Sequence, residues 1–316
     1  MVRATAMALH TTSGRASLGL SLALATAALW ATLPVALAYA LEALDPYTLT
    51  WFRFLVAFVL FGAWVVARGG VRRYRALDRR GWGLLSIAAV MLTCNYVGYL
   101  LGLHRTTPAN SQLLIQLAPF LMAMGGILVF GERFTRAQWI GSAVLLLGLG
   151  LFFRDQLGQV AADPARYLEG SAFIAFAAVT WAVYALCQKQ LLRVLTAAEV
   201  LAFIFGFATL ALLPTADLAA LGRVEPSYWI AIGYAALNTL AAYGCFAEAL
   251  AHVEASRVSA MLALNPLMTL GVVTTAHAVL PLVFPESHVA WLGVIGALVT
   301  VAGSMVVNLG GKKRPA

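Results

Sequence analysis

Charged side chains are rare inside the apolar stretches of this sequence, and the few that occur there are the first candidates for chemistry. Glu248 lies in YGCFAEALAH, and His252 follows it at i+4, which puts both residues on one face of a helix. A glutamate beside a histidine can take up a proton or bind a substrate ammonium group. The alternative is that the two side chains only satisfy each other near an interface with water.

Two further ionisable side chains lie within apolar stretches. His277, in TTAHAVL, is a candidate for substrate binding or proton transfer, and the alternative is a packing residue held by hydrogen bonds. Arg53 lies about seven residues into its stretch, on the order of 10 Å from the end of a helix that rises 1.5 Å per residue. We expect Arg53 to extend its guanidinium group outward to water and to have a structural role.

Neutral hydrogen-bonding side chains recur at helical spacing. Gln112 and Gln116 are i and i+4, and Asn265 and Thr269 repeat that spacing later in the chain. Such groups suit a binding site for a small polar solute whose hydration shell must be replaced. The alternative is hydrogen bonding between helices, which is worth only about 1 kcal/mol per contact in membranes.

A proline stands beside each of these polar pairs. Pro119 lies in TTPANSQLLIQLAPFLM and Pro266 lies in VEASRVSAMLALNPLMTL, 147 residues further along. Each proline removes a backbone donor and frees a carbonyl in the middle of a helix, which is tolerated in a membrane where protein or a cavity lies alongside. The pattern therefore predicts either two helix breaks that line a cavity or two simple kinks.

The elements that carry these residues are apolar runs of membrane-spanning length. Of the 316 residues, 62% are apolar and 11% are charged, against roughly 25% charged in soluble domains. A helix needs about 20 mostly apolar residues to cross a bilayer. The sequence predicts ten such helices, at residues 17–40, 46–67, 82–103, 107–130, 136–153, 169–188, 197–216, 227–250, 255–282 and 288–309.

The net charge of +8 indicates membrane topology and contact with anionic lipid rather than a nucleic-acid site. With the N terminus inside, sixteen of the 21 basic residues fall on the inner side, including the arginine-rich loop from Arg68 to Arg80. Four fall on the outer side. Because basic residues concentrate in cytoplasmic loops, both termini are predicted to be cytoplasmic.

Three matches at nearly one spacing indicate an internal repeat. Besides the proline pair, ALATAALWA lies over AFAAVTWA at an offset of 151, and WIGSAV lies over WLGVIG at 152. An odd number of crossings reverses direction, so we predict an all-α membrane protein of ten transmembrane helices in two inverted five-helix repeats. The predicted segments are a cytoplasmic tail (1–16), the first repeat (17–153), an extracytoplasmic linker (154–168), the second repeat (169–309) and a basic cytoplasmic tail (310–316).

Four motifs, in their order and spacing, resemble those of a known family. ALWAT with Trp30, DPYTLTWFRF with Arg53, TTPANSQLLIQLAPFLMAMGGILVFGERFT and ASRVSAMLALNPLM are similar to the EamA-type members of the drug/metabolite transporter superfamily. The resemblance implies a bacterial inner-membrane carrier, often an exporter of amino acids or related metabolites. It also implies a central cavity lined mainly by the first, third, fourth, sixth, eighth and ninth helices. One departure is the pair Gly131-Glu132, which has no counterpart at Val279 in the second half.

Aromatic side chains cluster on four of the helices that the resemblance places at the cavity. They are expected to form aromatic walls around a solute, and the alternative is that they serve as interface belts or packing residues. The candidates are Trp30, Tyr96, Tyr99, Trp181, Tyr184 and Tyr243.

Several other kinds of site are not expected. Cys94, Cys187 and Cys245 lie in predicted helices without metal-ligand spacing, so they are predicted to be packing residues, with no disulfide, metal or cofactor. The sequence has no glycine-rich phosphate loop and no nucleophile motif, which argues against ATP-driven transport and against an enzyme. Phosphorylated sugars are disfavoured as solutes because no basic pair lies near the midplane.

Small residues recur on the fifth and tenth predicted helices. Gly141 with Gly148, and Gly293 with Ala297, predict close helix packing. A homodimer interface through these residues is an alternative use of the same pattern.

Together these features predict a secondary carrier that exports a small zwitterionic or neutral metabolite, such as an amino acid or a related compound. Alternating access of the two halves around the proline helices would move the solute, with proton coupling or by facilitated diffusion. The alternative from a different class is a non-transporting membrane scaffold or sensor, whose midplane would be packed solid by large apolar side chains.

Overall fold

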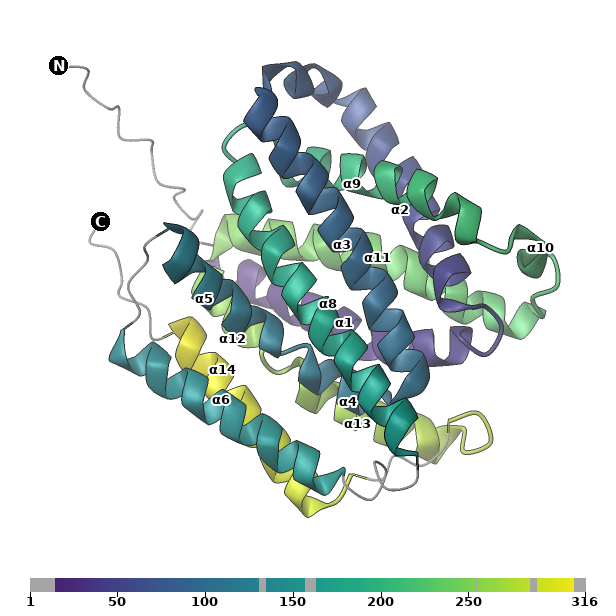
Figure 1. Cartoon of the computed structure of the whole chain (residues 1–316), viewed down its shortest axis with the longest axis vertical. Helices are drawn as coiled ribbons and strands as arrows, with labels where there is room; N and C mark the ends of the chain where they lie inside the picture. Colours follow the sequence, from purple (N-terminus) through teal and green to yellow (C-terminus); the bar gives the residue numbers. More distant parts are fainter. Residues whose placement is uncertain (1–14, 131–134, 157–162, 254, 285–288, 310–316) are drawn as a thin grey trace.

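Every regular element is a helix in the computed structural model, which describes residues 15–130, 135–156, 163–253, 255–284 and 289–309 (Figure 1). Eight segments in these ranges are long and apolar enough to cross a membrane, and a shorter apolar stretch covers Trp291–Val307. The all-helical membrane fold is thereby confirmed for the described residues, whereas the count of ten spans stays a prediction. The elements are α1 (Ala16–Ala40), α2 (Pro46–Ala67), η1 (Gly70–Ala76), α3 (Arg79–Arg105), α4 (Pro108–Leu114), α5 (Leu117–Phe130), α6 (Arg136–Asp155), α8 (Pro164–Leu191), α9 (Ala197–Leu212), η2 (Leu213–Thr215), α10 (Leu218–Leu221), α11 (Pro226–His252), α12 (Ala255–Leu262), α13 (Asn265–Val279) and α14 (Trp291–Leu309).

Capping residues set where several helices begin. The carboxylate of Asp45 accepts from the backbone N–H groups of Tyr47 (2.8 Å) and Thr48 (3.1 Å) at the start of α2. Asp163 caps α8 in the same way, with Pro164 in the first turn. Helix α8 therefore begins inside the predicted linker 154–168, because the cap and the proline lie before the apolar run.

The two proline runs, at residues 107–130 and 255–282, are each broken into two helices. Ile115 and Gln116 form a turn between α4 and α5, and Ala263 and Leu264 form one between α12 and α13. Pro119 has no N–H to donate to the carbonyl of Ile115, which accepts instead from Ala118 at 2.9 Å. The breaks lie before the prolines because a missing i to i−4 bond acts on the preceding turn.

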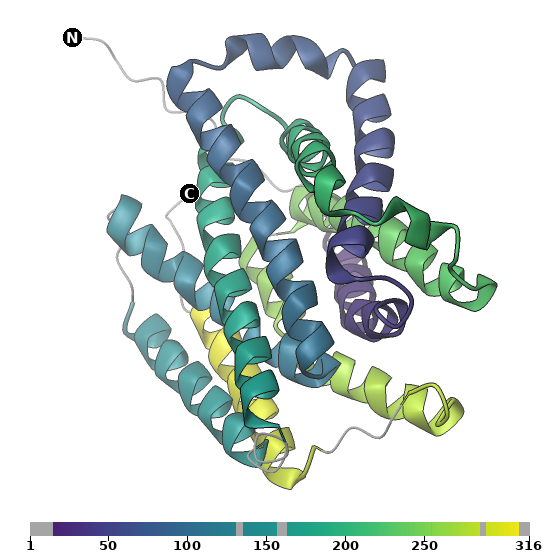
Figure 2. The same ribbon diagram turned by 45° about the vertical axis from the view of Figure 1, so that its right-hand side comes forward.

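Helices from the two halves of the chain pack in exchanged pairs (Figures 1 and 2). Helix α3 lies along α8, and α11 lies along α1. In each pair the third long helix of one half packs on the first helix of the other half. Helix α2 packs on α9, and α6 packs on α14. The largest apolar core joins α2, α3, α8 and α9 and includes Phe54, Leu92, Tyr184 and Phe205. The halves are therefore interlocked rather than side by side.

Glycines bring α6 and α14 into backbone contact. A Cβ atom on Gly296 would lie 2.6 Å from the backbone nitrogen of Phe152, and one on Gly141 would lie 2.9 Å from the carbonyl of Gly303. Ala297 is 3% exposed in the core between the same two helices. The predicted close packing is confirmed, and it lies within one chain. A homodimer would have to use a different surface, because the contact surface of Gly141 is covered by α14.

Some predicted features lie outside the described residues. They are most of the N-terminal tail (residues 1–14), the Gly131-Glu132 pair, the centre of the linker (157–162) and the C-terminal tail (310–316).

Candidate functional site

Arg53 is buried at the centre of the helix bundle, with 2% of its surface exposed. Its Nη2 donates to the hydroxyl of Thr239 on α11 at 3.1 Å, and its guanidinium carbon lies 5.0 Å from the centre of the Tyr96 ring on α3. The expectation that Arg53 reaches outward to water was wrong. The side chain instead turns to α3 and α11, because a tyrosine face and a hydroxyl are within its reach there.

Tyrosines from three helices surround this arginine. Tyr96 and Tyr99 on α3 and Tyr243 on α11 all lie within electrostatic range of the guanidinium group. Tyr184 on α8 lies in the same range of Tyr243 and is 1% exposed. The structure thus brings together four of the predicted aromatic residues, and they lie near an arginine that was expected to extend outward to water.

The two predicted tryptophans have different surroundings. Trp30 on α1 packs edge-on against Tyr243, with ring centres 5.7 Å apart, and lies 5.9 Å from Phe246. Trp181 packs against the apolar core between α2, α3, α8 and α9. Trp30 is therefore continuous with the tyrosine cluster, and Trp181 contacts the apolar core.

The polar residues of the broken helices make contacts across the halves. The side-chain amide of Gln116 donates to the carbonyl of Ala263 at 3.2 Å, so the two turns that interrupt the proline runs touch. Tyr99 donates its hydroxyl to Gln112 at 3.1 Å, which connects α4 to the tyrosine cluster. Thr269 donates to the carbonyl of Ala31 at 2.9 Å. These bonds fit the alternative of hydrogen bonding between helices as well as solute binding.

Asn265 lies directly after the second turn and keeps an unsatisfied group. It is 6% exposed, and its side-chain oxygen has no hydrogen-bond partner among the described residues. Pro266 follows it in the first turn of α13 and is also buried. A buried amide acceptor without a partner is rare in proteins, so Asn265 remains a candidate for contact with a solute.

Glu248 and His252 form the predicted pair at the end of α11. The Nε2 atom of His252 lies 3.2 Å from Oε1 of Glu248, whose side chain is 62% exposed while that of His252 is 9% exposed. The pair lies away from the buried arginine, since it stands in the last two turns of α11. His277, near the end of α13, lies with Nδ1 2.8 Å from the carbonyl of Phe284, which fits a packing role.

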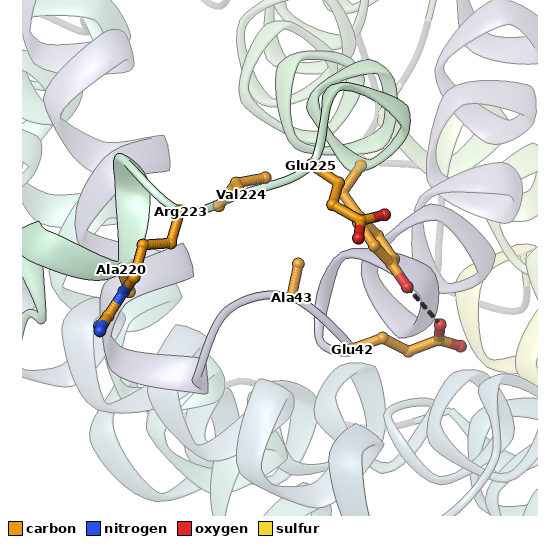
Figure 3. Close-up of a pocket in the computed structure, with 7 residues that line it drawn as sticks. Glu42, Ala43, Ala220, Arg223, Val224 and Glu225 are labelled. Carbon is orange, nitrogen blue, oxygen red and sulfur yellow. Dashed lines mark hydrogen bonds between the residues drawn. The ribbon is translucent and has the colours of Figure 1, made fainter.

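Two pockets lie at the ends of the bundle and not at the tyrosine cluster. One, of about 390 Å³, is lined by the α1–α2 and α10–α11 connections, and Tyr228 there donates to Glu42 at 3.2 Å (Figure 3). The other, of about 230 Å³, lies between the end of α2 and the start of α9. Neither is lined by a residue that the sequence predicted as a site.

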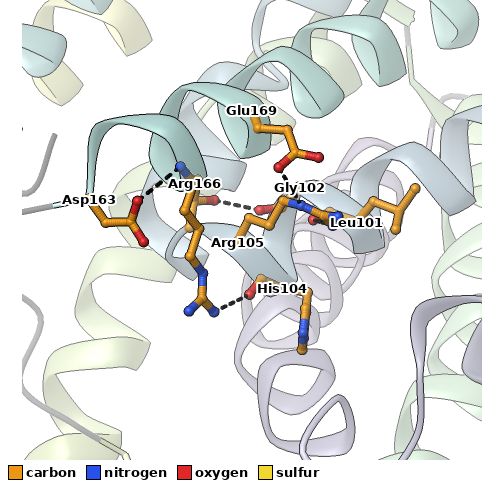
Figure 4. A network of polar contacts seen from close by, with 8 residues as sticks. Leu101, Gly102, His104, Arg105, Asp163, Arg166 and Glu169 are labelled. Atoms are coloured by element: carbon orange, nitrogen blue, oxygen red, sulfur yellow. Dashed lines mark hydrogen bonds and ion pairs between the residues drawn. The ribbon is translucent and has the colours of Figure 1, made fainter.

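A polar network joins α3 to α8 at the end where α3 stops (Figure 4). Nε of Arg105 lies 3.1 Å from the carboxylate of Glu169, and Arg166 donates to the carbonyl of His104 at 3.0 Å. Half of the Glu169 side chain is exposed, so this ion pair contributes little to stability by itself. It does fix the ends of two helices that come from different halves.

Glu199 is a buried acid that the sequence analysis did not single out. Its carboxylate accepts from the backbone of Thr196 at 2.7 Å in a capping box and lies 3.5 Å from Arg73. Tyr74 donates its hydroxyl to the carbonyl of Glu199 at 2.6 Å, and burial together with this acid raises the pKa of Tyr74 to about 12. The T-x-x-E pattern in TAAE is the signal that could have identified Glu199 as a cap.

Known proteins are similar to this chain over almost its whole length. The inner membrane transporter YhbE of Escherichia coli K12 is 32% identical over 297 residues, which cover 94% of this chain and 92% of the relative. The aromatic amino acid exporter YddG of Ancylobacter novellus is 30% identical over 204 residues, or 64% of this chain and 66% of that protein. A crystal structure with 22% identity superposes with a TM-score of 0.62 over 94% of this chain and 96% of its own, and this likeness supports the fold alone.

Both halves of the internal repeat match the profile of one protein family. The profile of the EamA-like transporter family matches residues 17–154 and again residues 168–309. This double match covers most of the chain and agrees with the resemblance drawn from the ALWAT, WFRF and proline motifs. The chain therefore belongs to the EamA-like transporter family.

Proposed function

We propose that this protein is a secondary carrier of the inner membrane that exports a small zwitterionic or neutral metabolite, such as an amino acid. Ten spans in two inverted halves would work by alternating access, with both termini in the cytoplasm. The proposal is supported by the names of two relatives, an inner membrane transporter and an aromatic amino acid exporter.

The observation that carries the proposal is the contact between the two helix breaks. Gln116 and Ala263 are 147 residues apart, the same offset as the two prolines, and they are joined by one hydrogen bond of 3.2 Å. Broken helices are tolerated inside a membrane where protein or a cavity covers the freed backbone groups. A single bond worth about 1 kcal/mol can be made and broken as two halves rock against each other.

The scaffold or sensor alternative would have a different interior. A purely structural bundle is stabilised best by well-packed apolar side chains, and a buried arginine and an unpartnered amide oxygen are costly there. Among the described residues, Arg53 and Asn265 carry such groups. Their presence favours an interior that meets polar solutes.

Transport can be tested without knowing the solute in advance. Metabolites released by a strain that overproduces the protein are compared with those released by a deletion strain, and solutes that differ are then loaded into proteoliposomes. We expect at least one small zwitterionic or neutral metabolite to leave both the cells and the proteoliposomes faster. Equal release from both strains, together with no efflux of a panel of amino acids from proteoliposomes, would favour the scaffold or sensor.

A further inference from the structure

We propose that Arg53 binds the carboxylate of the transported solute, an inference that rests on the proposed function and narrows its substrate class to compounds with an anionic group. The interior of the bundle then holds a carboxylate site formed by α2, α3, α8 and α11.

Arg53 has fewer hydrogen-bond acceptors around it in the described part of the chain than its guanidinium group can use. A guanidinium group has five N–H donors, and a buried charge is costly unless it is paired. One hydrogen bond goes to Thr239, and Nε has no partner among the residues that the structure describes. Among the described residues no acidic side chain forms an ion pair with Arg53.

The other arginines provide a comparison. Arg73 and Arg105, at the ends of the bundle, are paired with Glu199 and Glu169. Arg53 is the more deeply buried, yet it has no such partner in the described part of the chain. Two parallel bonds from a guanidinium to a carboxylate are among the strongest polar contacts in proteins. A solute carboxylate would therefore accept the hydrogen bonds that the guanidinium group of Arg53 does not make within the described chain.

Arg53 also lies at the depth expected of a solute site. Thr239 stands thirteen residues from either end of α11, so the arginine is held level with the middle of that helix. Arg53 itself lies about 10 Å from the first residue of α2 at 1.5 Å per residue. The midplane between two inverted halves is where carriers of this architecture bind their solutes.

Both halves of the chain contribute to the surroundings of Arg53. Tyr96 and Tyr243 occupy equivalent positions, 147 residues apart, and both lie near Arg53. The buried hydroxyl of Tyr184 adds a polar group that a bound solute can contact. With its carboxylate on Arg53, an amino acid could place its ammonium group against a tyrosine ring. Such a solute would touch both halves at once.

The test uses the purified full-length protein and pairs of probes that differ only in the anionic group. Each of the twenty common amino acids and its amide is titrated against the protein in detergent, with the shift in unfolding temperature as readout. We expect at least one amino acid to bind about tenfold or more tightly than its amide, because a charge-assisted bidentate contact is lost in the amide.

Variants then assign the preference to one residue. Arg53→Gln should bind the amino acid and the amide within about twofold of each other, and Arg53→Lys should retain part of the preference because it keeps the charge. Arg68→Gln is the matched control, since Arg68 directly follows the same helix as its C-cap residue and also stacks on an aromatic ring, Trp64, at 4.5 Å. It should keep the full preference. If Arg53→Gln does not fold, Arg53→Lys carries the comparison.

Each other outcome is decisive. Equal binding of acid and amide to the parent protein, or an unchanged preference in both Arg53 variants, overturns the carboxylate site and leaves the proposed carrier standing. Binding or export of solutes that all lack an anionic group does the same. If no amino acid binds and none is transported, the proposed substrate class and the carboxylate site both fail.

Discussion

Two buried charged residues of this chain have very different surroundings. Glu199 is 3% exposed and is satisfied by the backbone of Thr196 and by Arg73. Arg53 is equally buried, but in the described part of the chain its polar contacts are to Thr239 and the Tyr96 ring, with no acidic partner. A buried charge whose hydrogen bonds are made within the protein is typical of a structural role. A buried charge without such bonds is typical of a site that binds a ligand.

The pair of Glu248 and His252 allows a test of proton coupling at the level of one side chain. Glu248→Gln keeps the shape of the residue and removes the proton that it could carry. We expect this variant to reach the membrane normally but to lose the dependence of export on an imposed pH difference, and Glu248→Asp to retain part of that dependence. Efflux from proteoliposomes with and without a pH difference measures both.

Glu225→Gln is the control for this experiment, because Glu225 is exposed at the opposite end of the same helix and its side chain does not cap α11. It should respond to the gradient like the parent. A Glu248→Gln variant that also responds like the parent would mean that the carrier is uncoupled or is coupled elsewhere, with His277 as the next residue to change.

At the scale of elements, the contact between the two helix breaks can be removed by one substitution. Gln116→Leu deletes the amide that donates to Ala263, and the carbonyl in the turn loses its partner. We expect the rate of export to change about fivefold, which corresponds to about 1 kcal/mol, because the bond favours one of the conformations of the cycle. Initial rates of efflux from proteoliposomes measure the effect.

Gln138→Leu separates this effect from a general loss of hydrogen bonding. Gln138 also donates across the halves, to the carbonyl of Val307 on α14 at 3.3 Å, but away from the breaks. It should lower thermal stability with little change in rate. Equal rates in the parent and in Gln116→Leu would show that the contact between the breaks is not part of the transport cycle.

The close packing of α6 on α14 predicts that alanine substitutions at two glycines of α6 differ in their effect on stability. A Cβ on Gly148 would collide with the backbone of Thr300, whereas one on Gly150 would meet nothing within 4 Å. Gly148→Ala should destabilise the protein by about 1–3 kcal/mol, which lowers the melting temperature by roughly 2–10 °C. Gly150→Ala should melt at the parent temperature or above it, because alanine favours helix. The reverse order of melting temperatures would contradict the packing of α6 on α14.

The elements were predictable where one property of the sequence decides them. Lipid requires long apolar runs, so the helices were located to within a few residues, and Pro119 and Pro266 indicated the runs that break. The partner of Arg53 was not predictable, because Thr239 is 186 residues away and nothing local distinguishes it from other threonines. Arg53 was expected to extend its guanidinium group outward to water, because that is the ordinary behaviour of an arginine near a helix end.

At the scale of the whole molecule, the direction of the bundle in the membrane can be tested at its two ends. Ala76, at the end of η1, lies in the arginine-rich loop that we predict to be cytoplasmic, and Ser227 lies at the start of α11 on the opposite side. Both are exposed. In a variant without Cys94, Cys187 and Cys245, Ala76→Cys should resist an impermeant thiol reagent in spheroplasts, and Ser227→Cys should react.

Permeabilised spheroplasts provide the control, since both cysteines should then be labelled. Ala76 and Ser227 are chosen over the cap residue Asp78, whose carboxylate accepts from Gly81 at 2.7 Å and whose loss would disturb α3. Rapid labelling of Ala76→Cys before permeabilisation would reverse the orientation and with it the assignment of both termini.

The exchanged pairing of α3 with α8 and of α1 with α11 also has a consequence for biosynthesis. The ribosome adds about 5–20 residues per second, so roughly 5–20 s pass between the end of the first repeat and the completion of α11. During that time Arg53 lacks Thr239, and α1 lacks the helix on which it packs. The nascent chain must therefore pass through an interval in which Arg53 lies in the bilayer without Thr239. In this interval membrane quality-control proteases would have access to the chain.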